Sequence, residues 1–169
     1  MTLLQPSVGS SDFWAGSGFE DELLQAQGDF SLNAGQHSVT YQPNDETTAT
    51  GRYQVLLYDN NFGAAESYPK FDWGQLGAAV VTDYSRGSHS FGRIFTVDEV
   101  VRTYELEDQI AVPFSGYVSS AQRVGNSNNM LVASGQAKTF TEYDRYGLPI
   151  ATFEMEAEKY IYRVYKYEL

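Results

Sequence analysis

The chain has no cysteine and only two histidines, His37 and His89, among its 169 residues. Without a thiol, no cysteine can serve as a nucleophile or a redox group, so covalent catalysis near neutral pH would fall to one of the two imidazoles. The absence of cysteine fits a reducing cytosol as well as an exported protein that avoids thiols, and therefore assigns no compartment.

Positive charge is scarce: 11 Lys and Arg residues stand against 22 Asp and Glu residues, and the formal net charge is -11. Such a surface repels polyanions, which excludes nucleic acid and anionic membranes as partners. Long apolar runs are also missing, so no membrane span is predicted, and the opening MTLLQPSVGSSDFW does not read as a signal peptide. An anionic substrate would need positive groups from its own pocket.

Helical signals are rare, and the one segment that carries them is FEDELLQAQ at residues 19–27. Its early acidic residues, followed by Leu23 and Leu24, predict a short helical turn. From residue 38 onward the pattern has period two and is rich in Tyr, Phe, Val and Thr, which favours strands. The predicted strands cover residues 38–41, 52–58, 90–97, 101–106, 118–124, 130–134, 139–143, 150–155 and 160–167.

The strand pattern repeats. HSVTYQ, YQVLLYDN, GRIFTVDE and VRTYELE form one four-strand meander, and SSAQRV, NMLVASGQ, KTFTEYDRYG and IATFEME form a second. A repeat of roughly 40 to 50 residues suggests propeller blades. We therefore predict an all-β fold, a partial β-propeller with about two four-stranded antiparallel blades plus flanking strands. Because propellers usually close with about four to eight blades, the chain is expected to be a fragment, to close by oligomerising, or to form an open stack.

Segment boundaries follow from this repeat. Residues 1–36 are predicted to form a connector and the edge of a preceding blade, residues 37–112 one blade, residues 113–159 a second blade, and residues 160–169 a closing strand. Residues 64–86 interrupt the first blade as a long, weakly periodic insertion, which we expect to be a functional loop or a lid.

Several segments of the sequence resemble the C-terminal part of the bacterial arylsulfotransferases, which are six-bladed propeller enzymes. They are FWAGSGFEDELLQAQGDFSLNAGQHSVTY, VLLYDNNFG, VSSAQRVGNSNNMLVASGQ with the later FTEYD, and the closing YRVYKYEL. GQHS and YDNNFG are the most specific of them. The resemblance implies transfer of a sulfuryl group from an aryl sulfate to a phenol, without a nucleotide sulfate carrier or any other cofactor.

In that family the histidine of the QH[ST] motif becomes sulfated, and in this sequence that histidine is His37. The resemblance thus implies that His37 is the catalytic nucleophile. Gln36, Asn60 and Ser119 are predicted to contact substrate, although simple packing of small residues at the crowded axis explains Ser119 equally well, and no metal site is predicted. Two further histidines and an arginine that surround the sulfate in the family come from earlier blades, which this chain is expected to lack. Its activity alone is therefore in question.

Other polar residues have plainer interpretations. His89 is interpreted as a solvated loop residue. Arg86 and Arg93 could supply positive charge near the site, although a surface salt bridge is the better interpretation for Arg93 because it alternates within a strand. Asp59 and Asn60 fit an Asx-type turn as well as a role in shaping the site. The acidic residues near 98–107 lack the spacing of a glycosidase or a metal site.

The leading hypothesis is therefore the C-terminal fragment of an aryl-sulfate sulfotransferase with a sulfohistidine intermediate and small phenolic substrates. The resemblance also implies a periplasmic or extracellular location, although no signal peptide is seen. The alternative is a non-catalytic β-propeller fragment that binds a ligand or a protein. A homo-oligomer is expected if the chain acts alone, because unclosed blades expose sheet faces and edges.

Overall fold

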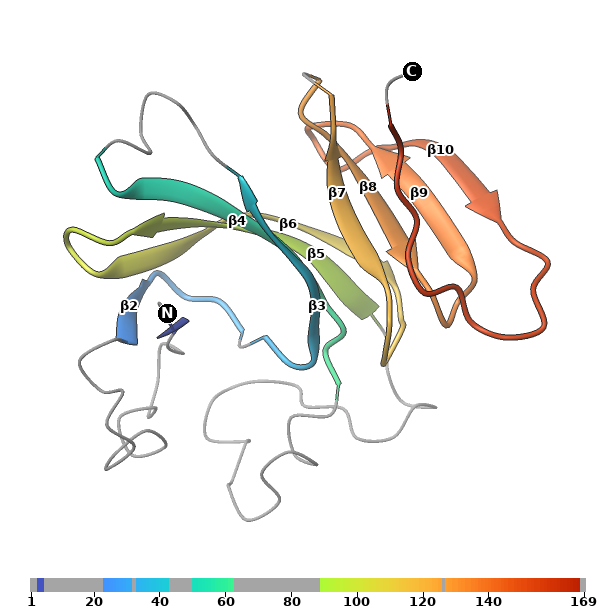
Figure 1. Cartoon of the computed structure of the whole chain (residues 1–169), viewed down its shortest axis with the longest axis horizontal. Coiled ribbons are helices and arrows are strands. Elements are labelled where there is room, and N and C mark those ends of the chain that lie inside the picture. Colours follow the sequence, from blue (N-terminus) through green and yellow to red (C-terminus); the bar gives the residue numbers. More distant parts are fainter. Residues whose placement is uncertain are drawn as a thin grey trace, which may run out of the picture.

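A computed structural model describes residues 3–4, 23–31, 33–42, 50–62, 89–125 and 127–167 of the chain. Every regular element in these residues is a β-strand, and the strands form two sheets that lie side by side (Figure 1). The predicted insertion over residues 64–86, which contains Arg86, lies outside the described residues, as do residues 19–22 of the predicted helical turn.

The first sheet has the strand order β1-β2-β6-β5-β4-β3. Its strands are β1 (Leu3–Leu4), β2 (Leu23–Gln27), β3 (Gln36–Gln42), β4 (Arg52–Asp59), β5 (His89–Asp98) and β6 (Thr103–Pro113). Strands β3 to β6 form a consecutive antiparallel meander, and β2 adds to the outer edge of β6 in a parallel pairing. This meander is the first of the two repeats predicted from the sequence.

The second sheet is a four-stranded antiparallel meander with the order β10-β9-β8-β7. Its strands are β7 (Ser120–Val124), β8 (Asn129–Ser134), β9 (Thr139–Tyr143) and β10 (Pro149–Glu154). Two successive four-stranded meanders with a flanking strand confirm the predicted all-β fold class and are consistent with a partial propeller. The exact boundaries proposed for the blades stay a prediction.

The two sheets are held together by an apolar cluster between their facing surfaces. Leu56, Tyr58 and Ile94 of the first sheet pack with Met130 and Val132 of the second. The other face of the first sheet carries a second cluster that includes Phe95 and Tyr104 and is covered by Leu24 and Phe30. The first sheet is therefore covered on both faces, and His37 lies on its edge strand, β3.

The predicted helical turn is wrong where the structure describes it, because residues 23–27 form strand β2. Leu23 and Leu24 are buried, whereas Gln25 and Gln27 are exposed. A run this short cannot be told from a strand by periodicity, and here the free edge of β6 offers backbone partners from Gln25 onward. Pairing with an existing sheet outweighs the weak local preference for helix.

Both ends of the strand predicted at 101–106 also differ from the prediction. The strand predicted at 101–106 begins at Thr103, because the Asp98 carboxylate accepts hydrogen bonds from the backbone N–H groups of Val100 and Val101 and holds them in a turn. The same strand extends to Pro113, because β5 continues to pair with it as far as His89.

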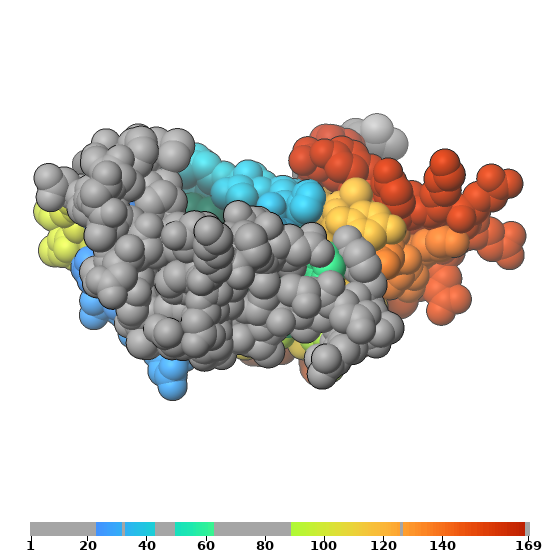
Figure 2. Space-filling model, turned by 90° about the horizontal axis from the view of Figure 1, so that it is seen from below, coloured from blue at the N-terminus to red at the C-terminus, as the bar shows by residue number. Residues whose placement is uncertain are grey.

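The predicted closing strand at 160–167 is irregular, although it runs along β7. The Ser120 hydroxyl bonds to the backbone N–H and carbonyl of Val164, and the Gln122 amide does the same with Lys166. Side chains thus replace the backbone ladder that a regular strand would use. Figure 2 shows β9, β10 and the segment after them, in orange to red, standing out at one end of the molecule.

Candidate functional site

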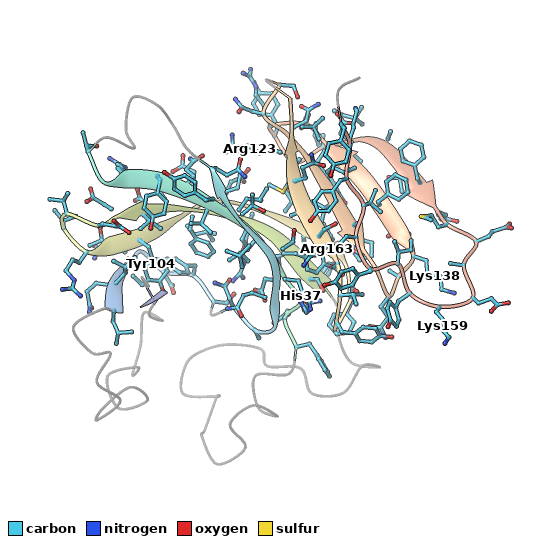
Figure 3. The ribbon with its side chains drawn as sticks, viewed as in Figure 1. His37, Tyr104, Arg123, Lys138, Lys159 and Arg163 are labelled. Carbon is cyan, nitrogen blue, oxygen red and sulfur yellow. The ribbon has the colours of Figure 1, made fainter. Side chains whose placement is uncertain are left out.

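His37 is the second residue of β3, at the end of that strand which lies beside the second sheet (Figure 3). His37 pairs with Tyr58 of β4. Directly after His37 the register of the two strands shifts in a β-bulge, in which Ser38 has a left-handed backbone conformation with a φ of 55°. Bulges of this kind redirect a side chain at the rim of a sheet. The half-buried His37 ring is thereby set at the junction of the two sheets.

One nitrogen of the His37 ring is occupied by protein atoms. Its Nδ1 lies 2.6 Å from Oδ1 of Asn60 and 3.0 Å from the carbonyl oxygen of Gly35. Both partners are oxygens that accept hydrogen bonds, so the proton of a neutral ring belongs on Nδ1. The lone pair of the neutral ring then lies on Nε2.

Asn60 is fully buried, and its side chain is hydrogen-bonded to the loop that precedes the second sheet. Its Nδ2 donates to the carbonyl oxygens of Ser115, at 2.5 Å, and Val118, at 3.0 Å. Sequence reasoning singled out Asn60 but missed Ser115 and Val118, which were read as part of a Pro-Gly break and a strand. Backbone carbonyls leave no signature in side-chain chemistry, so no pattern in the sequence could have found them.

The other two predicted substrate contacts occupy contrasting environments. Gln36 is exposed at the first position of β3, next to His37. Ser119 is fully buried, and its hydroxyl donates to that of Ser115 and accepts from the N–H of Gly135. The structure therefore brings Asn60 into contact with His37 and places Ser119 behind Asn60.

Asp59 and Arg93 form a buried ion pair next to this group, with 3.0 Å between Oδ2 and the guanidinium. The interpretation of Arg93 as a surface salt bridge is therefore wrong, because the segment after Gly28 covers its side of β5. Arg93 also donates to Ser31 and Asn33 of that segment. Burial raises the pKa of Asp59 and lowers that of Arg93, and their mutual attraction opposes both changes.

The Asp59 carboxylate also anchors the two loops around His37. Its Oδ1 accepts from the N–H of Ala34, at 2.8 Å, and from the N–H of Asn61, at 2.9 Å. The second contact is the predicted Asx-type turn. The first one ties the loop that precedes His37 to the end of β4, and a role of Asp59 in shaping the site stays a prediction.

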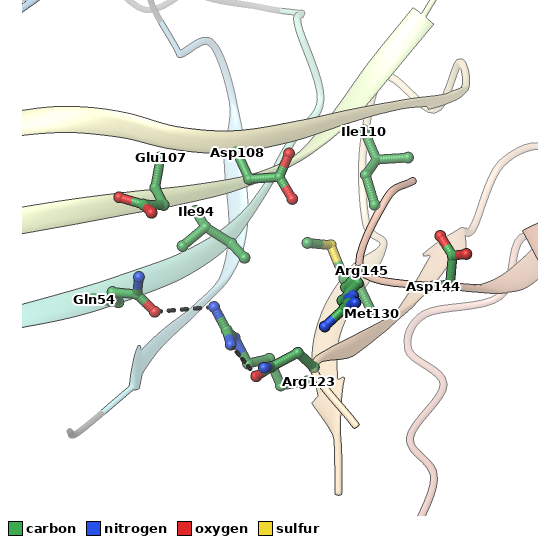
Figure 4. Close-up of a pocket in the computed structure, with 10 residues that line it drawn as sticks. Gln54, Ile94, Glu107, Asp108, Ile110, Arg123, Met130, Asp144 and Arg145 are labelled. Carbon is green, nitrogen blue, oxygen red and sulfur yellow. Dashed lines mark hydrogen bonds between the residues drawn. The ribbon is translucent and has the colours of Figure 1, made fainter. Parts of the chain in front are cut away.

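His89 begins β5 and is exposed; its backbone carbonyl accepts from the side chain of Asn61. Elsewhere, a cavity of about 410 Å³ lies between the sheets, toward the end of β4 far from Tyr58 (Figure 4). Arg123 crosses it and donates to Gln54 and Asn128. None of the predicted site residues lines this cavity.

Within the part of the chain that the structure describes, no group of three or more potential metal ligands occurs, and no helix is long and apolar enough to cross a membrane. A family model described as Arylsulfotransferase (ASST) matches residues 4–165. Among curated proteins, none matches the chain. The family match spans both sheets and includes His37, Asn60 and Ser119.

Proposed function

Because the chain belongs to the arylsulfotransferase family, we propose that it forms the C-terminal part of an enzyme that moves a sulfuryl group from an aryl sulfate to a phenol by way of a sulfated His37. The observation that carries this proposal is the state of the His37 ring. Its Nδ1 faces two acceptor oxygens, which leaves the lone pair on Nε2. An imidazole in that state is ready to act as a nucleophile.

The reaction proceeds in two displacements. In the first, Nε2 attacks sulfur, an N–S bond forms, the bond from sulfur to the aryl oxygen breaks, and the first phenolate leaves with the electron pair. In the second, the acceptor phenol oxygen attacks sulfur, the N–S bond breaks, and its electron pair returns to Nε2. The proton of the acceptor passes to solvent or to the departing phenolate. One hard transfer is thereby divided into two easier ones.

Charge on the sulfuryl oxygens has to be stabilised while it is transferred. The net charge of -11 cannot provide this, so local donors must. Arg93 is not free for this role, because it is fully buried against Asp59. We therefore propose that turnover needs the histidines and the arginine which the family resemblance places in other blades. We further propose small phenolic donors and acceptors, and a periplasmic or extracellular location as the family resemblance implies.

Of the predicted contacts, Gln36 is the one that substrate can reach directly, because it is exposed beside His37. Asn60 and Ser119 are fully buried and would act from behind the imidazole. This assignment refines the prediction that all three contact substrate. Substitution of Gln36 should therefore change the KM for the aryl sulfate, whereas substitution of the buried pair should change kcat.

The test is a covalent adduct. The full-length protein, in which this chain is joined to the other blades, is mixed with 4-nitrophenyl sulfate, and its intact mass is measured together with the release of 4-nitrophenol. We expect one added sulfuryl group, located by peptide mapping on His37. His37→Asn should abolish the adduct, and His89→Asn is the matched control because it removes an exposed imidazole. An enzyme that transfers sulfate normally with Asn at position 37 would overturn the proposal.

A further inference from the structure

We propose that Asn60 is a positioning residue that holds His37 in its Nδ1-protonated form, and that the loop at residues 115–119 fixes the orientation in which Asn60 does so. This inference rests on the proposed role of His37 as the nucleophile. It gives the second sheet a part in catalysis, because the loop that starts that sheet controls an imidazole on the first sheet.

The orientation of the Asn60 amide follows from its neighbours. Two carbonyl oxygens, those of Ser115 and Val118, lie within hydrogen-bond distance of Nδ2. A carbonyl oxygen only accepts, so both must face the NH2 group. The amide oxygen is then directed away from them and lies 2.6 Å from Nδ1 of His37. A flipped amide would set its oxygen against two other oxygens and leave its NH2 group against the ring.

The loop that holds Asn60 is itself held in an unusual conformation. Val118 and Ser119 have backbone φ angles of 56° and 93°, a region that a β-branched residue such as Val rarely adopts. Such a conformation persists only where the surroundings fix it. Here the N–H of Ser119 donates to the carbonyl of Tyr162, and the Ser119 hydroxyl bonds to Ser115 and Gly135. Val118, which has this unusual φ, supplies one of the two carbonyl oxygens that orient Asn60.

An amide suits this position better than a carboxylate would. Sulfation of Nε2 makes the ring cationic as long as Nδ1 keeps its proton. When the N–S bond then breaks in the second displacement, the leaving group is a neutral imidazole. The uncharged Asn60 oxygen holds that proton without neutralising the ring. A carboxylate at this position would stabilise the cationic intermediate and slow the step that consumes it, because a stabilised intermediate faces a higher barrier to the next step. It would also set its oxygens against the carbonyls of Ser115 and Val118.

Nitrogen-15 NMR of the histidine rings tests the orientation without any turnover. In the wild-type protein we expect the His37 ring to show a protonated Nδ1 and an unprotonated Nε2; the spectrum of His89→Asn assigns the signals. Asn60→Ala should raise the fraction of the Nε2-protonated form several-fold, although not completely, because Gly35 still offers its carbonyl to Nδ1. Asn61→Gly is the matched control: it removes the neighbouring amide at a φ of 54°, which glycine accepts, and should leave the His37 signals unchanged.

The second variant is Asn60→Asp, which keeps the shape of the side chain. With 4-nitrophenyl sulfate and excess phenol, we expect a larger fraction of the enzyme to stay sulfated at steady state than in the wild type, with a lower kcat. A wild-type His37 protonated on Nε2, or an unchanged tautomer in folded Asn60→Ala, would overturn the proposal. If the tautomer is as expected but His37 is never sulfated, the positioning role stands and the proposed nucleophile is wrong.

Discussion

The guanidinium of Arg93 lies 3.0 Å from the carboxylate of Asp59, and neither side chain is exposed by more than 1%. The pair joins β5 to the end of β4, one residue before Asn60. Asp59 also binds the N–H of Ala34 and Arg93 binds Ser31, so the pair fastens the loop that leads into His37. An ion pair in the first sheet thus fixes the loop that precedes the candidate nucleophile, His37.

Arg93→Met should destabilise the protein by about 3 kcal/mol, because it leaves the Asp59 charge buried without its partner. Urea unfolding measures the loss. The destabilisation should be smaller at acid pH than at neutral pH, because without Arg93 the Asp59 carboxyl binds a proton more readily and a neutral carboxyl is easier to bury. The matched control is Arg52→Met, whose partner Glu105 is about half exposed, as is Arg52 itself. Its loss should stay below about 1 kcal/mol, and equal losses for the two variants would contradict the assignment.

Gly35→Ala should destabilise the loop before His37 and reduce sulfation of the histidine. Gly35 has a φ of 71°, and a Cβ there would lie 2.6 Å from the carbonyl oxygen of Phe62. Both the backbone conformation and the close approach are therefore violated, and a loss of about 2 kcal/mol or more is expected. Gly147→Ala is the control, because its φ of 77° is similar but its Cβ would meet only ordinary contacts, 3.7 Å from Ile110. Thermal unfolding should rank Gly35→Ala as clearly the less stable of the two.

The strands of both meanders could be predicted from the sequence because apolar residues recur along them and clusters of turn residues separate them. For β2 and for Arg93, where the prediction was wrong, the deciding partner was distant in the chain. β2 forms because β6 offers an open edge, and Arg93 is buried because the segment around Ser31 covers it. Alternation places Arg93 on one face of β5 but does not say what covers that face.

The candidate site was predictable only in part for the same reason. His37 lies in a recognisable motif, GQHS, and Asn60 stands among turn-forming residues directly after a predicted strand. The contacts that orient them come from the carbonyls of Ser115 and Val118, which lie 55 and 58 residues after Asn60. Every residue type carries a backbone carbonyl, so the amino-acid sequence bears no mark of this role. Only the packing of two sheets brings the groups together.

Glu142 should make the attachment of the C-terminal segment dependent on pH. Hydrogen bonds from Lys166 and Asn129 lower the pKa of the Glu142 carboxyl, and the Lys166 ammonium lies 2.8 Å away. A carboxyl with a lowered pKa in the folded state adds stability above its ordinary pKa and loses it as the pH falls through the lowered value. The effect should be below about 1 kcal/mol, because the side chain of Lys166 is 54% exposed. Comparison of wild type with Glu142→Gln in urea at neutral pH and at pH values below the ordinary carboxyl range should show the difference only at neutral pH.

The outer face of the second sheet should cause the chain to self-associate. Phe140 and Phe153 stack there with their ring centroids 4.7 Å apart, and Phe153 is still 50% exposed. Further large apolar side chains are exposed in β10 and in the segment after it: Ile150, Met155, Tyr160, Tyr162 and Tyr165. Large apolar side chains left exposed in number on one part of a protein mark an interaction site, and in a propeller the occupant would be a neighbouring blade.

Sedimentation velocity over a range of concentrations measures this association. We expect the average mass of the chain to rise with concentration, and Phe153→Glu to suppress the rise, because a charge on the stacked pair would have to be buried in the contact. Val101→Glu is the matched control, since Val101 is 64% exposed in the turn between β5 and β6, away from that face. A wild-type chain that remains monomeric at every concentration would show that this face needs no partner.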